Sequence, residues 1–402
     1  MKRYLCSIII GMVVILSIGT YYVKVASSAS SLPKYTFKTL EGSDKELDPV
    51  IINASLQNGS NFYEPLTIES NTTKYASERS YLENLTGRQD HLIERLVKEH
   101  RSFMRGKDSI SSLYEDDDFL AYARVNSEYT KSGNMEAKFD IGLLEKKDEE
   151  ETSFQIELPN QGRIMNADVR DVQLVHSKLQ VLTMNDVNSN NEKQTKEVHL
   201  YTIDVANKKV LSDKTLVSET FTDPEQVDFQ MPIDLAPSQP NNMVFISLIK
   251  GVNHEDGFEE KLKESKLLSY NYETEKVETV KKGSLSLDMA RSGYTDGKNL
   301  YTVEMKSGKY RIKTFDLSSQ TLTNDTELDI AANKEEQYTA AFKNGRVYFL
   351  LNGMNQVGKT NKPAKLLIAD IKTGKTLYKG ETIINKKNSK SFELYIDDLE
   401  IK

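Results

Sequence analysis

The sequence predicts a mainly β protein built from repeated small sheets, and three observations lead to that fold class. Runs with alternating apolar and polar residues fill the chain from Phe119 to the end. A similar hairpin recurs five times within that part. The one long apolar run without charge stands apart, at the N-terminus, where it predicts a transmembrane helix.

Residues 1–26 are predicted to be an N-terminal transmembrane anchor or an uncleaved signal. Residues 5–23 carry no charge, and as a helix they would reach about 28 Å, close to the apolar thickness of a bilayer. Lys2 and Arg3 place the N-terminus in the cytoplasm by the positive-inside rule. We therefore expect a single-pass protein of the cell membrane whose C-terminal domain lies outside the cytoplasm.

Cleavage of this segment is the alternative. Ser27, Ser28 and Ala29 offer small residues for a signal peptidase, and cleavage near Ala29 would make the protein secreted. Cys6, the only cysteine, lies at the start of the apolar run, so the exported part has no disulfide. Its stability must come from burial of a large core.

Composition excludes several classes of protein. The chain has 402 residues, 28% of them charged, with a mean hydropathy of −0.54, which is typical of a soluble domain rather than of a multi-span membrane protein. The net charge is −7, and leaving out the three cations Lys2, Arg3 and Lys24 gives −10 for the exported part. An acidic domain repels nucleic acid, so no nucleic-acid partner is expected.

Residues 27–117 are predicted to form a separate N-terminal segment with short strands and one amphipathic helix, 86–105. Thr86 and Gln89 have the spacing of a capping box at the start of this helix, and Gly106 is expected to end it. Between them the apolar residues recur on one face: Leu92, Ile93, Leu96, Val97, Phe103 and Met104. Such a face packs on the β region or on a partner. Short strands are expected at 35–40, 50–55 and 66–69.

The recurring hairpin is clearest at 366–377, where an apolar strand runs into Asp370, a turn follows with Gly374, and a second strand leaves. Upstream copies carry Asp140, Asp204, Asn271 and Asp316 at the position of Asp370, at steps of 64, 67, 45 and 54 residues. An Asp or Asn there can accept hydrogen bonds from the N–H groups of the turn, which explains its recurrence without catalysis.

A period near 45 residues with about four strands per unit is typical of a β-propeller, because one small sheet cannot bury both of its faces alone. We predict a propeller domain over 118–402 with five legible blades. A sixth or seventh blade would use strands from 35–75 together with Phe392–Ile401, so that the final strand closes the ring. Two β-rich domains without closure are the alternative.

Two stretches of the sequence resemble bacterial β-propeller repeat proteins of the WD40-like and YVTN-like kind: Asn344-Gly345-Arg346-Val347-Tyr348-Phe349-Leu350 and Leu366–Lys375. The resemblance covers about residues 118–402. It implies a membrane-anchored, extracytoplasmic propeller, although the Trp-Asp signature of the WD40 family is absent because the chain has no Trp.

No catalytic, cofactor-binding or metal-binding residue is predicted. The five histidines are spread along the chain without a nucleophile or a ligand set beside them: His91, His100, His176, His199 and His254. The four acids Glu115–Asp118 lack the ligand spacing of an EF-hand and read as a solvated turn. Gly353–Thr360 has the spacing of a P-loop, but Pro363 and the strand from Leu366 leave no room for its helix.

We therefore expect a binding or interaction module for a protein, peptide or envelope-derived ligand rather than an enzyme. The alternative is a hydrolase that uses carboxylates in the propeller funnel. The tight acidic clusters Asp168–Asp171 and Asp223–Glu225 are interpreted as loops or blade junctions. Ligand loops are expected at 185–194, 254–258 and 354–362.

Overall fold

A computed structural model describes most of the chain beyond the N-terminus. It covers residues 11–14, 16–17, 19–20, 32–58, 62–69, 72–79, 90–129, 135–188, 193–253, 260–280, 293–332, 336–352, 363–384 and 392–402. The chain divides into two compact units. Unit 1 consists of residues 1–89, 305–311 and 326–402, and unit 2 of residues 90–304 and 312–325.

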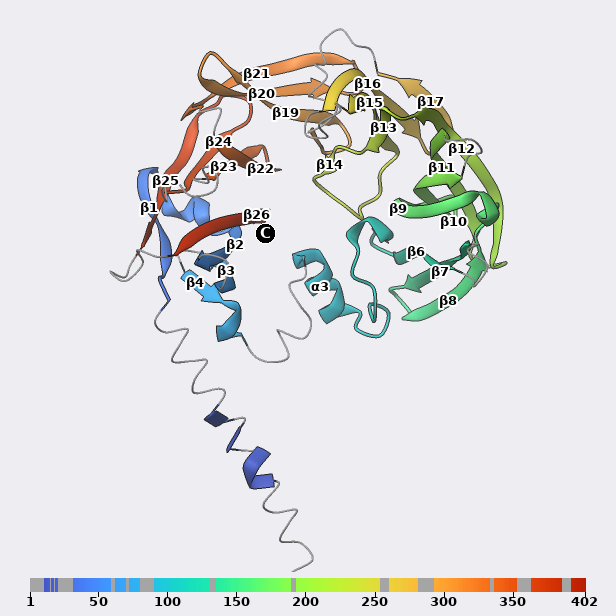
Figure 1. The fold of residues 1–402 in the computed structure, drawn as a ribbon, viewed down its shortest axis with the longest axis horizontal. Helices are drawn as coiled ribbons and strands as arrows, with labels where there is room; N and C mark the ends of the chain where they lie inside the picture. The colour runs from blue at the N-terminus through green and yellow to red at the C-terminus, as the bar shows by residue number, and fades with distance from the viewer. Residues whose placement is uncertain are drawn as a thin grey trace, which may run out of the picture. The chain divides into compact units, whose positions relative to one another are not determined.

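The described residues form six sheets of four or five strands, which confirms the mainly β expectation (Figure 1). Within these sheets nearly every strand is antiparallel to its neighbours, and most neighbouring strands also follow each other in the sequence. Such meanders arise where short alternating runs are joined by tight turns.

Two sheets of unit 1 combine strands from both ends of the chain. One has the order β26 (Glu393–Ile401), β2 (Val50–Asn58), β3 (Phe62–Glu69), β4 (Thr72–Tyr75). The other has the order β1 (Tyr35–Gly42), β25 (Thr376–Ile384), β24 (Lys365–Asp370), β23 (Arg346–Asn352), β22 (Gln337–Lys343). The C-terminal strand therefore completes the N-terminal sheet, as the sequence led us to expect of residues 35–75 and 392–401.

Three sheets belong to unit 2. The first has the order β5 (Leu113–Glu115), β6 (Phe119–Tyr129), β7 (Met135–Glu145), β8 (Glu150–Glu157). The second has the order β12 (Lys209–Thr222), β11 (Lys193–Asp204), β10 (Lys178–Asn188), β9 (Ile164–Val175). The third has the order β13 (Glu225–Gln230), β15 (Met243–Asn253), β16 (Glu260–Asn271), β17 (Lys276–Thr279).

The sixth sheet has residues of both units. Its order is β14 (Ile233–Asp234), β18 (Tyr294–Thr295), β19 (Asn299–Lys306), β20 (Lys309–Asp316), β21 (Thr321–Ala331). β14 is parallel to β18, and it reaches this sheet from the segment between two strands of the third sheet of unit 2. This crossing strand becomes important for the cavity described below.

Buried side chains join sheets that follow each other in the chain. In unit 1, Ile52 and Leu66 share a core with Leu350 and Ile368. In unit 2, Phe139 of the first sheet meets Tyr201 of the second with ring centroids 4.9 Å apart. Further cores join the second sheet to the third, and the third to residues of the sixth. The sheets joined in this way bury apolar side chains against each other, which a single small sheet cannot do alone.

The hairpin turns follow one rule, which corrects one expected position. Asp204, Asn271, Asp316 and Asp370 each end a strand and accept a hydrogen bond from a backbone N–H three residues on. The residue four positions later has a positive φ in every case: Lys208, Glu275, Gln320 and Gly374. The N–H of Ser319, together with the hydroxyl groups of Ser318 and Ser319, lowers the pKa of Asp316 to about 2.

Asp140, the first expected marker, was wrong, because it lies in the middle of β7. The positive φ of this hairpin belongs to Glu149, so the marker position is Glu145, the last residue of β7. The marker was chosen because Asp140 is an acid like the other markers. Asp140 instead continues the alternation of the strand and takes no part in a turn.

Gly374 is the turn position where glycine is needed most. Its φ is 68°, and a Cβ atom there would lie 2.5 Å from Thr326 Cγ2 and 2.7 Å from the carbonyl oxygen of Glu327. Gly345 has a similar φ of 72° but open space around the Cβ position. We expect Gly374→Ala to cost about 2–4 kcal/mol of unfolding free energy, from backbone strain and overpacking, and Gly345→Ala only about 1 kcal/mol. Urea unfolding of both variants checks this, and equal costs would contradict the predicted clash.

The predicted amphipathic helix is shorter than expected. Helix α3 spans His91–Glu99, and Asp90 caps it by accepting a hydrogen bond from the N–H of Leu92 at 2.7 Å. Turns rather than helix occupy residues 101–106, while the expected capping box, 86–89, lies outside the described residues. The buried side chains of α3, Ile93 and Leu96, pack on the first sheet of unit 2, in one core with Leu120, Tyr122 and Leu144. The helix therefore covers a sheet.

The predicted membrane segment is described only at residues 11–14, 16–17 and 19–20, which are helical. Met12, Val13, Val14 and Leu16 are exposed there. Within the part of the chain that the structure describes, no helix meets the length and hydropathy needed to cross a membrane. The described residues also form four short 3₁₀ helices: η1 (Asp44–Leu47), η2 (Ala76–Glu78), η3 (Ile110–Ser112) and η4 (Gln161–Arg163).

Candidate functional site: an acidic and apolar cavity in unit 2

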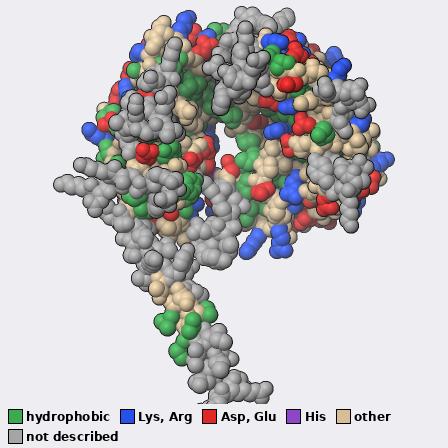
Figure 2. Space-filling view, in the orientation of Figure 1, with side chains coloured by type: hydrophobic (Ala, Val, Ile, Leu, Met, Phe, Trp, Pro, Cys, Tyr) green, Lys and Arg blue, Asp and Glu red, His purple; other side chains and the backbone are tan. Residues whose placement is uncertain are grey.

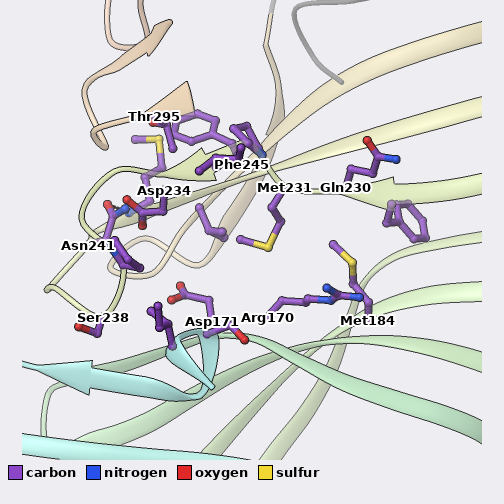
Figure 3. Close-up of a pocket in the computed structure, with 18 of the residues that line it drawn as sticks. Arg170, Asp171, Met184, Gln230, Met231, Asp234, Ser238, Asn241, Phe245 and Thr295 are labelled. Carbon is purple, nitrogen blue, oxygen red and sulfur yellow. Dashed lines mark hydrogen bonds between the residues drawn. The ribbon is translucent and has the colours of Figure 1, made fainter. Parts of the chain in front are cut away.

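A cavity of about 690 Å³ opens inside unit 2, where residues of several strands and of the segment 231–241 meet (Figure 3). β9 contributes Arg170 and Asp171, and the crossing strand β14 contributes Ile233 and Asp234. A volume of this size suits a small molecule or a few side chains of a peptide.

A break in strand register brings Arg170 and Asp171 to the cavity. On β10, Leu182 pairs with Asp171 while the next residue, Thr183, pairs with Val169, so Arg170 is the extra residue of a bulge. A bulge bends its strand and redirects side chains, and it often lies beside a functional site. Without it, residues 170 and 171 would point to opposite faces of the sheet.

Asp171 is held in place by three hydrogen bonds. The hydroxyl of Tyr272 donates to its Oδ2 at 2.5 Å, and Gln173 Nε2 and the N–H of Val172 donate to its Oδ1 at 3.1 and 3.0 Å. Tyr272 and Gln173 are buried. Gln173 also accepts a hydrogen bond from the N–H of Asn241 at 2.9 Å, which ties β9 to the segment 231–241.

Asp234 is presented by a turn that begins at β14. Its Oδ1 accepts a hydrogen bond from the N–H of Ala236 at 2.9 Å, and the strand itself is held by bonds from Ile233 to Gly293 and from Leu235 to Thr295. Figure 3 shows Asp234 beside Asn241 and Thr295, with Met184 and Gln230 at the other side of the cavity.

Burial dominates the electrostatics of these two carboxylates. It raises the pKa of Asp171, and the nearby charge of Asp234 raises it further, although the hydrogen bonds from Tyr272 and Gln173 act against this. Burial also raises the pKa of Asp234, with a smaller contribution from Asp296. Among the described residues, no lysine or arginine forms an ion pair with either carboxylate.

The other charged residues of the lining already have partners. Asp90 caps α3, and Asp228 pairs with Lys196 Nζ at 3.4 Å. The single cation of the lining, Arg170, lies 3.6 Å from Asp168. Asp171 and Asp234 are therefore the two aspartates of the lining that neither pair with a cation nor cap a helix.

Large apolar side chains make up part of the lining, three of them methionines: Met184, Met231, Met243, Phe229 and Phe245. Methionine adapts its shape to an apolar ligand, and phenylalanine offers a flat face. The cavity therefore combines two positioned carboxyl groups with an adaptable apolar surface, which suits binding. The described residues include no group of three or more His, Cys, Asp or Glu that could hold a metal ion.

Only part of this site follows from the sequence. Asp168 and Asp171 lie within β9 rather than in a loop, which corrects the interpretation of that cluster. Asp223 and Pro224 do join two sheets, since they connect β12 to β13. Asp234 and Ser238 were missed; the three prolines between 232 and 240 indicate an irregular segment there but not its neighbours.

The remaining predicted positions lie elsewhere. Three of these stretches are outside the described residues: 254–258, 354–362 and the P-loop-like 353–360. Of the expected loop 185–194, residues 185–188 belong to β10 and 193–194 to β11, and 189–192 are outside the described residues. Glu115 is not part of a solvated turn, because it pairs with Arg95 at 2.5 Å and with Lys146 at 2.8 Å. Asp116 does form the expected turn, accepting from the N–H groups of Asp118 and Phe119.

His199 forms a second cluster that the sequence did not reveal. Its Nδ1 lies 2.7 Å from Asp213 Oδ1 and its Nε2 lies 2.8 Å from Glu197 Oε2, and all three side chains are nearly buried. Burial alone would lower the pKa of His199, but the bonds to Asp213 and Glu197 outweigh it and raise this pKa. Both ring nitrogens of His199 are hydrogen-bonded within the cluster, so neither is free for a ligand.

The surface shows no field of one sign on the face drawn in Figure 2, where acidic and basic side chains are interspersed over the coloured residues.

Comparisons with known proteins do not assign a family. No family model matches the chain, and no curated protein matches it. Solved structures with some likeness include the polysaccharide lyase Uly1, at 10% identity and a TM-score of 0.35 over 67% of this chain and 57% of the lyase. A mutant of the Synechocystis apocarotenoid oxygenase has 9% identity and a TM-score of 0.40 over 89% and 96%. The Dos1 propeller has 9% identity and a TM-score of 0.28 over 64% and 58%. The chain thus spans less than two thirds of the lyase, and likenesses this weak do not identify its activity.

Proposed function

We propose that the chain is a six-bladed β-propeller that acts as a binding module outside the cytoplasm, with the cavity of unit 2 as its ligand site. The six blades are the six sheets, each a meander of the size expected for a blade. The pairing of β26 with β2 supports the ring, because a propeller is commonly closed by a sheet that takes strands from both chain ends.

One observation carries the binding role: the cavity holds two carboxylates without a compensating charge beside an apolar surface. A buried carboxylate without a compensating cation costs free energy in the empty protein. Buried groups with shifted pKa values cluster at functional sites. The ligand is a protein, a peptide or another molecule of the cell envelope, in keeping with the placement of the domain.

The proposed placement depends on residues 5–23, which carry no charge and are flanked by Lys2, Arg3 and Lys24. We propose that they anchor the protein in the cell membrane as a single span. Alkaline carbonate extraction tests this: the full chain should stay with the membrane, and a chain without residues 5–23 should not. Release of the full chain would instead favour secretion after cleavage near Ala29.

The binding role is tested by affinity capture from envelope extracts with the exported part, residues 27–402, as bait. A ligand of the cavity should be captured by the natural chain and lost with Asp171→Asn combined with Asp234→Asn. Asp117→Asn is the matched control, since Asp117 is an exposed acid of the same unit outside the cavity lining. Equal capture by all three chains would remove the cavity from the proposal.

A second candidate function, hydrolysis, is favoured by one feature of the same cavity. A carboxylic acid whose pKa is raised by burial can act as a general acid, and Asp171 and Asp234 both have raised pKa values. Assay of the purified domain on envelope glycans and peptides tests it. Turnover that disappears in Asp171→Asn or Asp234→Asn while Asp117→Asn keeps it would place the chain among the hydrolases.

A further inference from the structure

We propose that the cavity of unit 2 binds a primary ammonium group carried on an apolar chain, with the ammonium between Asp171 and Asp234. This inference rests on the proposed function, because it names the ligand class for the same site. Figure 3 shows the two carboxylates on the same side of the cavity, near Asn241 and Ser238.

The charge balance of the lining favours a cation. Four of its side chains are aspartates and one is an arginine. Asp228 is balanced by Lys196, and Arg170 by Asp168 outside the lining, while Asp90 is occupied as a helix cap. Asp171 and Asp234 remain, and the negative charge of Asp234 disfavours ionisation of Asp171. One positive group between them would relieve that repulsion.

The hydrogen-bond acceptors around the carboxylates suit an ammonium, which has three donors and no acceptor. Tyr272 and Gln173 keep Asp171 fixed, so little ordering is needed when a ligand binds. Ser238 adds a second, independent indication. It lines the cavity and is 7% exposed, and its hydroxyl has no hydrogen-bond partner among the residues described by the structure.

A hydroxyl of the lining without a partner in the protein can accept a hydrogen bond from a ligand atom. An N–H of the ammonium would donate to it. A carboxylate ligand, in contrast, would face Asp171 and Asp234 with a like charge.

The apolar side chains of the lining define the rest of the ligand. Met184, Met231 and Met243, together with Phe229 and Phe245, offer an apolar surface that an alkyl chain can cover. The ligand is therefore amphipathic, with the cation at one end. Two sources share this chemistry: a small alkylamine, and the side chain of a lysine in a peptide or protein.

Methionine methyl NMR of the full chain tests the inference, because three cavity residues are methionines and report occupancy directly. Their signals are assigned with single Met→Leu variants. The probes are hexylammonium, hexanol and hexanoate, which share one chain length and differ in charge. A blocked pentapeptide with one central lysine among alanines, compared with its norleucine counterpart, separates the peptide source from the small amine.

We expect hexylammonium to shift the three methyl signals and to bind at least tenfold more tightly than hexanol, with hexanoate weakest. Asp171→Asn and Asp234→Asn should each weaken it about tenfold or more, and Ser238→Ala several-fold, while Asp117→Asn leaves it unchanged. Ser238→Ala is the mild variant, since it removes one hydroxyl without touching a charge. Unshifted methyl spectra of the ligand-free variants show that the fold is kept.

Two results would overturn the inference. Hexanol or hexanoate binding as tightly as hexylammonium would refute the ligand class while leaving the cavity as a ligand site. A lack of methyl shifts with every probe would also refute it, and the capture experiment above would then decide the proposed function by itself.

Discussion

A chain that ends at residue 391 is expected to lose the cooperative unfolding transition of unit 1, because it lacks β26. This strand pairs with β2 at eight positions, from Gln57 with Glu393 to Val50 with Ile401. Its apolar side chains join the main core of unit 1: Leu394, Ile396, Leu399 and Ile401. Leu399 is fully buried and contributes about 1.5–3 kcal/mol, and the three partly buried side chains contribute less each, so together with the lost strand pairing their loss is a large part of the stability of a typical domain, about 5–15 kcal/mol.

Circular dichroism melts of the truncated chain measure this effect, with a chain that lacks only Lys402 as the control. Leu399→Ala, in a side chain that is 5% exposed, should cost about 2–4 kcal/mol. Asp398→Ala, at the exposed neighbouring position, should cost less than about 0.5 kcal/mol. A truncated chain with the melting curve of the full protein would show that β26 contributes nothing to the fold.

Replacing His199 with glutamine is expected to destabilise unit 2 by about 3 kcal/mol at pH 6, because it leaves two buried carboxylates without their cation. Glu197 and Asp213 hold the two ring nitrogens at 2.8 and 2.7 Å. Further contacts come from Arg163 to Glu197 at 3.7 Å and from Asn160 to Asp213 at 3.0 Å, while Tyr201 stacks on the ring. In the protonated form both ring nitrogens donate, and both acids are satisfied.

The sign of the pH dependence follows from the raised pKa of His199. A group whose pKa is higher in the folded state than in the unfolded state stabilises fully below its unfolded pKa, about 6.5. That stabilisation is lost as the pH rises through the folded pKa. The free energy of unfolding should therefore fall above pH 6.5 in the natural chain, and the fall should be smaller in His199→Gln.

Urea unfolding at several pH values between 6 and 9 measures this dependence, and ring NMR locates the pKa. His176→Gln is the matched control, since the side chain of His176 is 77% exposed. A folded pKa of His199 at or below 6.5, or the same fall in the glutamine variant, would contradict the assignment of the cluster as a protonated clamp.

The local features of the fold could be predicted from the sequence because their causes are local. Asp370 accepts the N–H of Thr373 only three residues away, and Gly374 takes its positive φ within the same turn. The helix lies where its apolar spacing indicated, yet Asp90 caps it and Glu99 ends it. Asp140 shows the limit of the approach: choosing the marker by residue type missed Glu145, whose position becomes plain only with the left-handed residue at 149.

The cavity could not be predicted, because tertiary structure creates it. Asp171 is noticeable in the sequence as part of an acidic cluster, but its partner Asp234 lies on a strand of two residues in a proline-rich segment. The bulge at Arg170 leaves no sequence signal, and the bond from Tyr272 to Asp171 spans 101 positions. His199 appears in the sequence as one residue of an alternating strand, and its two acids come from neighbouring positions of two paired strands.

The joining of both chain ends in one sheet supports the propeller and is tested most directly by a disulfide between β2 and β26. Gln57 and Glu393 are Cα partners in that pairing, and with Cys6→Ser the chain has no other cysteine. Gln57→Cys with Glu393→Cys should form an intramolecular disulfide on mild oxidation and raise the unfolding free energy by about 3–5 kcal/mol, since it closes a loop of roughly 340 residues. Disulfide-linked dimers, or an oxidised chain that is less stable than the reduced one, would contradict it.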